Sequence, residues 1–396
     1  MRSIELFAGA GGLALGMSKA GFDHAAIVEW NSDSCETITR NKNRGIAHVR
    51  HWPRPLSADA RNVDFAELGR GGIDVVSGGP PCQPFSMGGV ARGPLDSRDM
   101  FPQAVRAVRE LQPKAFVFEN VKGLLREKFA TYLEYVLLQL SYPTITARNS
   151  ECWTDHLARL EQHKTSEVRP VGLTYNVVFR LLNAANFGVP QKRERVFIVG
   201  FRSDLAAEWS FPEETHSEDA LLVAKWVTGE YWEDHGISGK RRPKIPPKLK
   251  SRVAKLAAQN QLFGAPQRWR TVRDAIADLP DPRSEEARSF LNHRFNEGAR
   301  SYPGHTGSPL DEPAKTLKAG DHGVPGGENM VALPDGELRY FSVREAARLQ
   351  TFPDRFEFHG SWSETMRQLG NAVPVALAKT VASSIFETLT GAPDAG

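Results

Sequence analysis

The sequence predicts an α/β fold, with a mostly parallel β-sheet covered by helices on both faces and a smaller, loop-rich domain. Three observations lead to this prediction. From Ser3 to about Phe201, short apolar runs alternate with segments of helical periodicity, which is typical of parallel strands wrapped by helices. Beyond Phe201 the chain becomes basic and rich in Gly and Pro. The segment 374–389 regains an apolar helical face and is expected to dock onto the first part.

The elements of the first part are predicted by their periodicity. The strand candidates are SIELFA, AAIVEW, IDVVSG, AFVFEN, YNVVFRLL and RVFIVGF, and the helix candidates between them are LALGMSKAG, DMFPQAVRAVRELQP and FATYLEYVLLQL. The second of these helices is expected to end at Pro113, since a proline is typical just past a helix end. In the later part, the sixteen residues from Lys240 to Lys255 include eight Lys or Arg and no acidic residue, and three prolines break any helix at its start.

Composition restricts the class of protein. A chain of 396 residues can form two or three domains with a full hydrophobic core and needs no disulfide or metal for stability. The cysteines Cys35, Cys82 and Cys152 lack C-x-x-C spacing, which favours free thiols in a reducing compartment. A strand-like run begins at Ser3 and no apolar run approaches membrane-spanning length, so we expect a cytoplasmic protein. The net charge of +3 does not by itself indicate a nucleic-acid partner.

A glycine-rich turn, ELFAGAGGLALG, lies between the first strand and the first helix. Such a turn lets the backbone and the helix N–H groups approach a ligand closely. Gly9, Gly11 and Ala14 fit the pattern G-x-G-x-x-[GA], and Glu29 ends the next strand twenty residues after Gly9. Glu29 can accept hydrogen bonds from both ribose hydroxyls and Trp30 can stack on adenine. The turn therefore predicts a nucleoside ligand, with a tight turn that binds nothing as the alternative.

The stretch GGPPCQPFS places Cys82 at the carboxyl end of a buried strand, where open α/β sheets bind their ligands. Pro80, Pro81 and Pro84 fix the backbone around the thiol, which limits the entropy lost in holding an attack geometry. This suits a nucleophile as well as a buried structural cysteine. No nearby histidine offers a Cys–His pair, so another group must activate the thiol.

Three more polar positions stand out. Glu119, with Asn120, ends the strand AFVFEN, where desolvation would raise the pKa of the carboxyl group and make it a general acid; a helix cap is the alternative. Arg193 and Arg195 are two residues apart before a strand, so extended backbone puts both on one face, unless they form a solvated strand entry. Asp59 could accept a hydrogen bond from an adenine amino group or cap the next helix.

In this order, the motifs resemble those of the C5-cytosine-specific DNA methyltransferases of bacterial type II restriction–modification systems. The resemblance spans nearly the whole chain and is carried by FAGAGG at 7–12, EW at 29–30, the Asp59 loop, GGPPCQPFS at 78–86, FENV at 118–121, QKRER at 191–195, YFSVREAARLQTFPD at 340–354 and QLGNAVPVALA at 368–378. Each motif alone is weak. Pro-Cys-Gln, Glu-Asn-Val and Gln-x-Arg-x-Arg together form a highly specific set.

The resemblance implies a reaction and a role for each candidate. The Cys82 thiolate would add to C6 of a cytosine flipped out of duplex DNA, so that C5 can take a methyl group from S-adenosylmethionine, which leaves as S-adenosylhomocysteine. Glu119 would hold N3 and the exocyclic amine, while Arg195, and with it Arg193, would contact the O2 side. No metal is implied. The residues expected to bind the cofactor are Phe7, Gly9, Gly11, Glu29, Trp30, Asp59 and Asn371.

The same resemblance implies how the chain is divided and what it meets. Residues 1–205 would form the catalytic and cofactor-binding domain, 206–342 the target-recognition domain, 343–370 a hinge segment, and 371–396 a C-terminal helix that completes the catalytic domain. Asn371 would return to the glycine turn, which implies that this helix packs beside the N-terminal strands. The expected partners are double-stranded DNA, with the basic segment 240–255 on its phosphates, and a cognate restriction endonuclease.

Two stretches depart from the family pattern. Residues 141–170 read as an insertion without an assigned role, and MGGVARGPLDSRD, after the nucleophile, receives no catalytic residue. Three other functions remain compatible with parts of the sequence. A nucleotide-dependent dehydrogenase would use the glycine turn and Glu29, a tRNA-acting relative would share the catalytic motifs, and a DNA-binding protein with a degenerate site would not catalyse a reaction at all.

Overall fold

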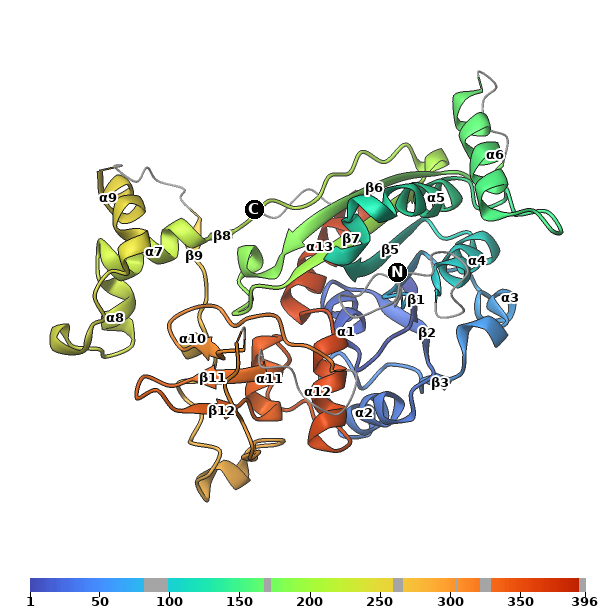
Figure 1. The fold of residues 1–396 in the computed structure, drawn as a ribbon. Helices are drawn as coiled ribbons and strands as arrows, with labels where there is room; N and C mark the ends of the chain where they lie inside the picture. The colour runs from blue at the N-terminus through green and yellow to red at the C-terminus, as the bar shows by residue number, and fades with distance from the viewer. Residues whose placement is uncertain (82–98, 167–171, 259–265, 304, 321–328, 392–396) are drawn as a thin grey trace. The chain divides into compact units, whose positions relative to one another are not determined.

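The chain forms two compact units (Figure 1). The computed structural model describes residues 1–81, 99–166, 172–258, 266–303, 305–320 and 329–391. The first unit comprises Met1–Leu182, Glu194–Pro212 and Phe352–Gly396, and the second comprises Asn183–Arg193 and Glu213–Thr351. Each unit is described separately below.

The first unit is built on a seven-stranded sheet with the order β3-β2-β1-β4-β5-β7-β6. Neighbouring strands from β3 to β5 are parallel, whereas β7 is antiparallel to β5. The mostly parallel sheet predicted from the sequence is confirmed. The strands are β1 (Arg2–Leu6), β2 (Asp23–Glu29), β3 (Leu56–Ser57), β4 (Val75–Gly78), β5 (Ala115–Val121), β6 (Tyr175–Asn183) and β7 (Glu194–Arg202).

Helices cover both faces of this sheet (Figure 1). Alternate residues of β1 point to opposite faces. Ile4 and Leu6 join a core cluster with α4 and α5, whereas the Ser3 hydroxyl bonds His24, whose other ring nitrogen lies 2.9 Å from the Ala14 carbonyl of α1. The helices of this unit are α1 (Gly12–Lys19), α2 (Ser32–Asn43), α3 (Phe65–Leu68), α4 (Phe101–Leu111), α5 (Ala130–Ser141), α6 (Trp153–Thr165), α12 (Trp362–Asn371) and α13 (Val375–Thr390).

The C-terminal helix α13 packs on α1, whereas the resemblance implied only a position beside the N-terminal strands. A Cβ atom placed on Gly16 would lie 2.3 Å from the Cβ of Ala378, so only glycine allows this approach. The expectation that the sequence contains no apolar run of membrane-spanning length needs correction. By length and composition alone, Trp362–Thr390 would qualify as a membrane span. However, the backbone at Ala372 and Pro374 is extended between α12 and α13, and 61% of the apolar window is buried, as in a core helix.

The stretch 141–170, expected to be an insertion, contributes α6 to the first unit. His156 of this helix is 2% exposed, and its ring nitrogens lie 2.9 Å from the Tyr135 hydroxyl and 2.8 Å from the Ile145 carbonyl. Arg159 adds an ion pair with Glu151 at 2.8 Å. The Tyr135 contact fastens the segment to α5, and the other two contacts hold the segment together.

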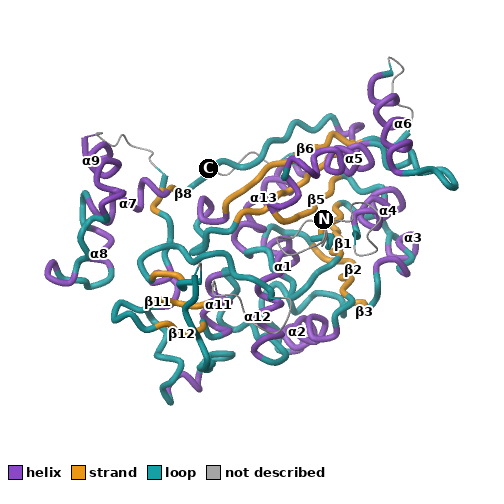
Figure 2. Tube along the Cα trace, viewed as in Figure 1, coloured by secondary structure: helices purple, strands orange, loops and turns teal. Residues whose placement is uncertain are grey.

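The second unit has little regular structure, and its loops dominate the region around β11 and β12 (Figure 2). It contains a two-stranded sheet, β8-β9, and a three-stranded sheet, β10-β11-β12. Its elements are β8 (His216–Ser217), α7 (Glu218–Trp226), α8 (Glu230–Asp234), α9 (Lys250–Ala258), β9 (Gln267–Arg268), α10 (Val272–Ile276), β10 (Ser308–Pro309), β11 (Met330–Ala332), β12 (Leu338–Tyr340) and α11 (Val343–Leu349).

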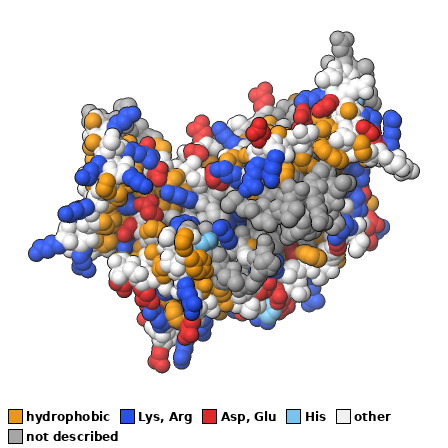
Figure 3. Space-filling model, viewed as in Figure 1, with side chains coloured by type: hydrophobic (Ala, Val, Ile, Leu, Met, Phe, Trp, Pro, Cys, Tyr) orange, Lys and Arg blue, Asp and Glu red, His pale blue; other side chains and the backbone are white. Residues whose placement is uncertain are grey.

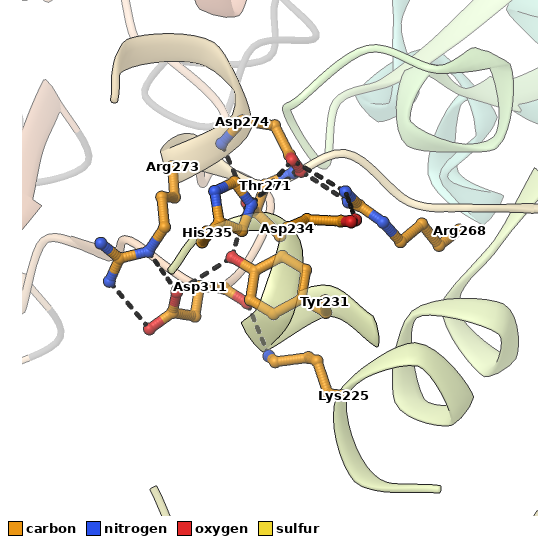
Figure 4. A network of polar contacts seen from close by, with 9 residues as sticks. All are labelled: Lys225, Tyr231, Asp234, His235, Arg268, Thr271, Arg273, Asp274 and Asp311. Carbon is orange, nitrogen blue, oxygen red and sulfur yellow. Dashed lines mark hydrogen bonds and ion pairs between the residues drawn. The ribbon is translucent and has the colours of Figure 1, made fainter. Parts of the chain in front are cut away.

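A polar network replaces extensive secondary structure in holding this unit together (Figure 4). The buried Tyr231 hydroxyl lies 2.9 Å from both Thr271 and Asp311, and Arg273 pairs with Asp311 at 2.7 Å. Lys225 is 4% exposed and donates to the Asp311 carbonyl at 2.6 Å. These bonds join α7, α8 and α10 to the loop that contains Asp311.

The unit boundaries differ from the expected domain limits. The change expected after residue 205 falls after Pro212, and the segment 183–193 belongs to the second unit. Backbone hydrogen bonds explain why the segment 183–193 belongs to the second unit. The Ala314 N–H donates to the Pro190 carbonyl at 2.9 Å, and the Lys192 N–H donates to the Ala314 carbonyl at 2.8 Å. Residues 343–351, expected in a hinge, also belong to the second unit, where the Arg344 N–H donates to the Asn292 carbonyl.

Candidate active site

The candidate residues of the first unit collect at one edge of its sheet. Parallel strands β1, β2, β4 and β5 end at this edge, which is where open α/β sheets bind ligands. Because β7 runs antiparallel to β5, its first residues also lie here, and Arg195 is in register with Val121. The antiparallel direction of β7 therefore places Arg195 next to the end of β5, which carries the Glu-Asn-Val motif.

The glycine turn has the backbone that its sequence predicts. Gly9 and Gly11 have φ values of +54° and +86°, in the left-handed region that favours glycine, and Phe7 shares this conformation at +54°. A Cβ on Gly11 would meet the Trp52 ring at 3.0 Å, whereas a Cβ on Gly9 would meet no atom within 4 Å among the described residues. Gly9 therefore borders open space, and Gly11 is needed for packing.

Glu29 fixes this turn from the end of β2. Its two carboxylate oxygens accept hydrogen bonds from the backbone N–H of Gly9 at 2.7 Å and of Asn31 at 2.8 Å. Burial raises the pKa of Glu29, and these hydrogen bonds oppose the shift. A carboxylate has about four acceptor positions, and the backbone N–H of Trp30 also bonds to this one, so acceptor capacity remains for a ligand hydroxyl. Trp30 is 74% exposed beside it, which leaves its ring available for stacking.

Two cofactor candidates have other surroundings. Asp59 accepts the Arg61 N–H at 2.9 Å and pairs with the Arg61 guanidinium at 2.7 Å, so it caps the 3-10 turn Ala60–Asn62. The capping alternative is thus observed, and hydrogen bonding from Arg61 lowers the pKa of Asp59. Asn371 is exposed at the end of α12.

The proline turn after β4 is tied to the end of β5. The Asn120 amide donates to the Pro80 carbonyl at 3.0 Å, and the Met100 N–H donates to the Pro81 carbonyl at 3.1 Å. A Cβ on Gly79 would lie 3.2 Å from Glu119 Oε2, so glycine admits this carboxylate. Cys82 itself lies outside the described residues. Asn120, named in the sequence only as a neighbour of Glu119, is the residue that anchors the turn leading to Cys82.

Glu119 forms a buried ion pair with Arg195. The distance between Arg195 Nε and Glu119 Oε1 is 2.7 Å, and the two side chains are only 10% and 8% exposed. Burial lowers the pKa of Arg195, and the charge of Glu119 opposes that shift. Arginine nevertheless stays protonated in proteins, so it places a fixed positive charge beside the carboxyl group.

Arg193 does not share this environment. It is fully buried and donates to the Leu317 carbonyl at 3.0 Å, within the second unit. The sequence predicts that both arginines lie just before a strand. In the structure β7 begins at Glu194, so Arg193 lies at the strand entry, where its carbonyl accepts the Ala184 N–H at 2.9 Å, and Arg195 lies within the strand.

The described residues contain no group of three or more His, Cys, Asp or Glu side chains that could hold a metal ion. The donors of the site are instead backbone N–H groups, two carboxyl groups, an arginine and an exposed indole. This set suits an organic ligand with hydroxyl groups and an aromatic ring, next to a second, planar polar ligand that contacts the Glu119–Arg195 pair.

Comparisons with known proteins identify the family and the fold of the chain. A family model described as C-5 cytosine-specific DNA methylase matches residues 1–142 and 154–387, and the gap lies inside the stretch expected to be an insertion. The Type II methyltransferase M.AplI of Arthrospira platensis is 32% identical over 98% of this chain and 87% of its own length. M.FnuDI of Fusobacterium nucleatum is 31% identical over 98% and 95%. The crystal structure of the S. pombe Dnmt2 methyltransferase matches with a TM-score of 0.56 at 18% identity, over 98% of this chain and 99% of that chain.

Proposed function

Because the chain belongs to the C-5 cytosine-specific DNA methylase family and is a DNA (cytosine-5-)-methyltransferase, we propose that Cys82, Glu119 and Arg195 carry its chemistry. The family decides against the dehydrogenase alternative. The observation that supports the proposal best is the buried pair of Glu119 and Arg195, which lies beside Gly79 in the turn that leads to Cys82.

Each of the three residues has a defined step. The Cys82 thiolate forms a bond to C6 of the flipped cytosine, and C5 becomes nucleophilic enough to take the methyl group. Glu119 holds N3 and the exocyclic amine and supplies a proton to N3 as the thiolate adds. Arg195 holds Glu119 in place and stabilises charge on the O2 side. Loss of the C5 proton, expulsion of the thiolate and return of the N3 proton to Glu119 then restore the ring, Cys82 and the acid.

The cofactor we propose is S-adenosylmethionine, which supplies an electrophilic methyl group when it is bound. The residues fit it: open space borders Gly9, the Gly9 turn is fixed, Glu29 keeps acceptor capacity for a ribose hydroxyl, and Trp30 presents an exposed ring. Phe7, Gly11, Asp59 and Asn371 complete the proposed set. Asp59 would have to exchange part of its bonding to Arg61 for a bond from the adenine amino group.

We propose that the second unit recognises the DNA target. Lys and Arg side chains gather over the part of it that carries α8 and α9 (Figure 3). Six basic residues of the segment 240–255 that form no ion pair within the described chain are exposed: Lys240, Arg241, Lys244, Lys248, Lys250 and Lys255. Such residues suit phosphate contacts, which position a protein without reading sequence. Because the named relatives are Type II methyltransferases, we further propose a cytoplasmic enzyme paired with a restriction endonuclease of the same site.

The test is bisulfite sequencing of genomic DNA from a host without cytosine methylation, with and without the expressed protein. We expect protected cytosines at one short recurring sequence. Cys82→Ser and Glu119→Gln should each lower protection by orders of magnitude while S-adenosylmethionine binding, measured by calorimetry, persists. Cys152→Ser is the matched control, because this thiol is exposed on the segment before α6 and should be dispensable.

Two outcomes would contradict the proposal. Protection by the Cys82→Ser variant at the level of the unmodified protein would remove the thiolate from the mechanism. A folded protein that binds S-adenosylmethionine but protects no DNA would move the search to RNA substrates.

A further inference from the structure

Glu5 is a carboxyl group buried in the middle of the sheet of the first unit, and the proposed chemistry does not use it. It lies on β1, two residues before Phe7 and the glycine turn, and is 1% exposed. An ionised carboxylate in such a place is costly unless a cation compensates it. Its side chain bonds to the hydroxyl of Ser77, which lies opposite Glu5 on the adjacent strand β4.

Ser77, like Glu5, is buried on a central strand just before a turn of the candidate active site. It is fully buried and directly precedes Gly78 and the proline turn that leads to Cys82. The two strands approach very closely at this point, since a Cβ on Gly78 would lie 2.4 Å from the Leu6 carbonyl oxygen. The pair Glu5–Ser77 therefore connects the strand that carries the glycine turn to the strand that carries the proline turn.

The hydrogen bonds around Ser77 indicate where the proton resides. Its hydroxyl lies within hydrogen-bond distance of Glu5 Oε2 and 3.5 Å from the Ile4 carbonyl oxygen. A hydroxyl has one proton and cannot donate to both acceptors. A protonated Glu5 resolves the conflict, because the acid O–H donates to Ser77, and Ser77 donates to Ile4. In agreement, burial raises the pKa of Glu5 to about 8, with the Ser77 bond opposing the shift.

We propose that Glu5, as a neutral acid bonded to Ser77, is a positioning residue that holds the glycine turn and the proline turn in their active arrangement. This inference rests on the proposed function of the site. Ionisation of Glu5 would place a charge at a position that is only 1% exposed, and the two turns would separate. The enzyme should therefore lose activity at alkaline pH through a group that touches neither substrate nor cofactor.

Other titratable groups belong to the elements packed on this face of the sheet. Burial lowers the pKa of His24 to about 4, so His24 is neutral throughout the relevant range. Burial, followed by repulsion from Lys379, lowers the pKa of Lys19 at the end of α1. The complete set of charged or titratable residues on β2, α1 and α13 is Asp23, His24, Glu29, Lys19, Lys379 and Glu387, and Asp74 precedes β4. A comparison of variants at position 5 leaves all of these unchanged.

The experiment compares the pH profile of methyl transfer in the unmodified enzyme and in Glu5→Gln, whose amide can still donate to Ser77 but cannot ionise. For the unmodified enzyme, kcat/KM should fall about tenfold per pH unit above pH 8, whereas Glu5→Gln should match it at pH 7 and show no such fall. Ser77→Ala removes the bond to Glu5 and should lower kcat/KM at every pH. Ser77→Thr keeps a hydroxyl, so its kcat/KM should lie between those of Ser77→Ala and the unmodified enzyme.

Stability gives a second readout that does not need activity. The folded pKa of Glu5 lies above the unfolded value of 4.5, so its contribution to stability is complete below pH 4.5 and is lost as the pH rises towards 8. The Tm of the unmodified protein should fall over this window relative to that of Glu5→Gln. Parallel Tm and activity profiles for the two proteins would overturn the inference. An unmodified enzyme that methylates DNA at no pH would instead contradict the proposed function, while the Tm comparison would still decide the state of Glu5.

Discussion

At the residue scale, the buried pair of Glu119 and Arg195 predicts an asymmetric response to mutation. Replacing Arg195 by Met leaves the Glu119 carboxylate without its partner, and breaking a buried pair in this way costs about 3–5 kcal/mol. In a unit of about 250 residues, where 1 kcal/mol shifts Tm by about 2–4 °C, we expect the apparent Tm to fall by roughly 6–20 °C. Arg202→Met is the matched control on the same strand, because its pair with Asp204 is exposed and should contribute ~0–1 kcal/mol.

A second substitution separates electrostatics from packing at this pair. Glu119→Gln combined with Arg195→Met removes both charges and should recover part of the lost Tm, although methyl transfer stays abolished. Thermal unfolding followed by circular dichroism measures both effects. If the double variant is as unstable as Arg195→Met alone, the cost arises from lost packing of the arginine side chain and not from an unpaired carboxylate.

Individual residues also show which contacts of the site can be predicted from the sequence and which cannot. Glu29 and Gly9 could be predicted because their spacing follows from a turn between two strands, and the structure joins them by a hydrogen bond. The separation of Arg193 from Arg195 could not be predicted, since spacing does not reveal that β7 begins at Glu194. The Glu5–Ser77 contact was also missed, because it depends on strand register across 72 residues of sequence.

At the element scale, the packing of α1 on α13 predicts the effect of a single methyl group. Gly16→Ala gains ~1 kcal/mol of helix propensity, yet its Cβ would lie 2.3 Å from Ala378 Cβ and 2.7 Å from the Lys379 backbone nitrogen. The backbone of α13 at Lys379 cannot rotate away as a flexible side chain could, so α1 and α13 must move apart. Overpacking of this kind costs about 1–3 kcal/mol or more. We expect a net loss of stability. Gly239→Ala is the control, because its Cβ would meet no atom within 4 Å among the described residues. A Tm of Gly16→Ala equal to or above that of the unmodified protein would show that the helix pair is loose.

The elements themselves were predictable to different degrees. Six of the seven strands of the main sheet coincide with the apolar runs named from the sequence, because buried strands are rich in apolar residues. The exception is β3, whose two residues Leu56 and Ser57 are exposed and belong to no apolar run. The antiparallel direction of β7 leaves no such signal, yet it decides that Arg195 meets Glu119. In the second unit, strands of two or three residues are too short for any periodicity, and contacts such as Tyr231 with Asp311 define the structure instead.

At the scale of the whole molecule, the division into two units separates chemistry from recognition in the proposed function. The catalytic candidates Glu119 and Arg195 belong to the first unit, whereas the exposed basic residues of 240–255 belong to the second. Motifs could identify the former, because reaction chemistry requires particular side chains at particular strand ends. The DNA sequence recognised could not be predicted, because base readout depends on a few side chains placed by loops.

The basic segment of the second unit predicts how DNA binding depends on salt. Lys248, Lys250 and Lys255 are exposed, whereas Arg252 between them pairs with Glu218 at 2.8 Å and is left unchanged. Each phosphate contact contributes about −0.9 to the slope of log Kobs against log salt concentration. Replacing the three lysines by Gln should therefore make the slope less steep by roughly 2–3, weaken binding of all duplexes about equally, and leave the methylated sequence unchanged. Fluorescence anisotropy at several salt concentrations measures the slope, and Lys164→Gln on α6 is the control. An unchanged slope would place the segment away from DNA, and an altered methylation site would mean that these lysines read bases.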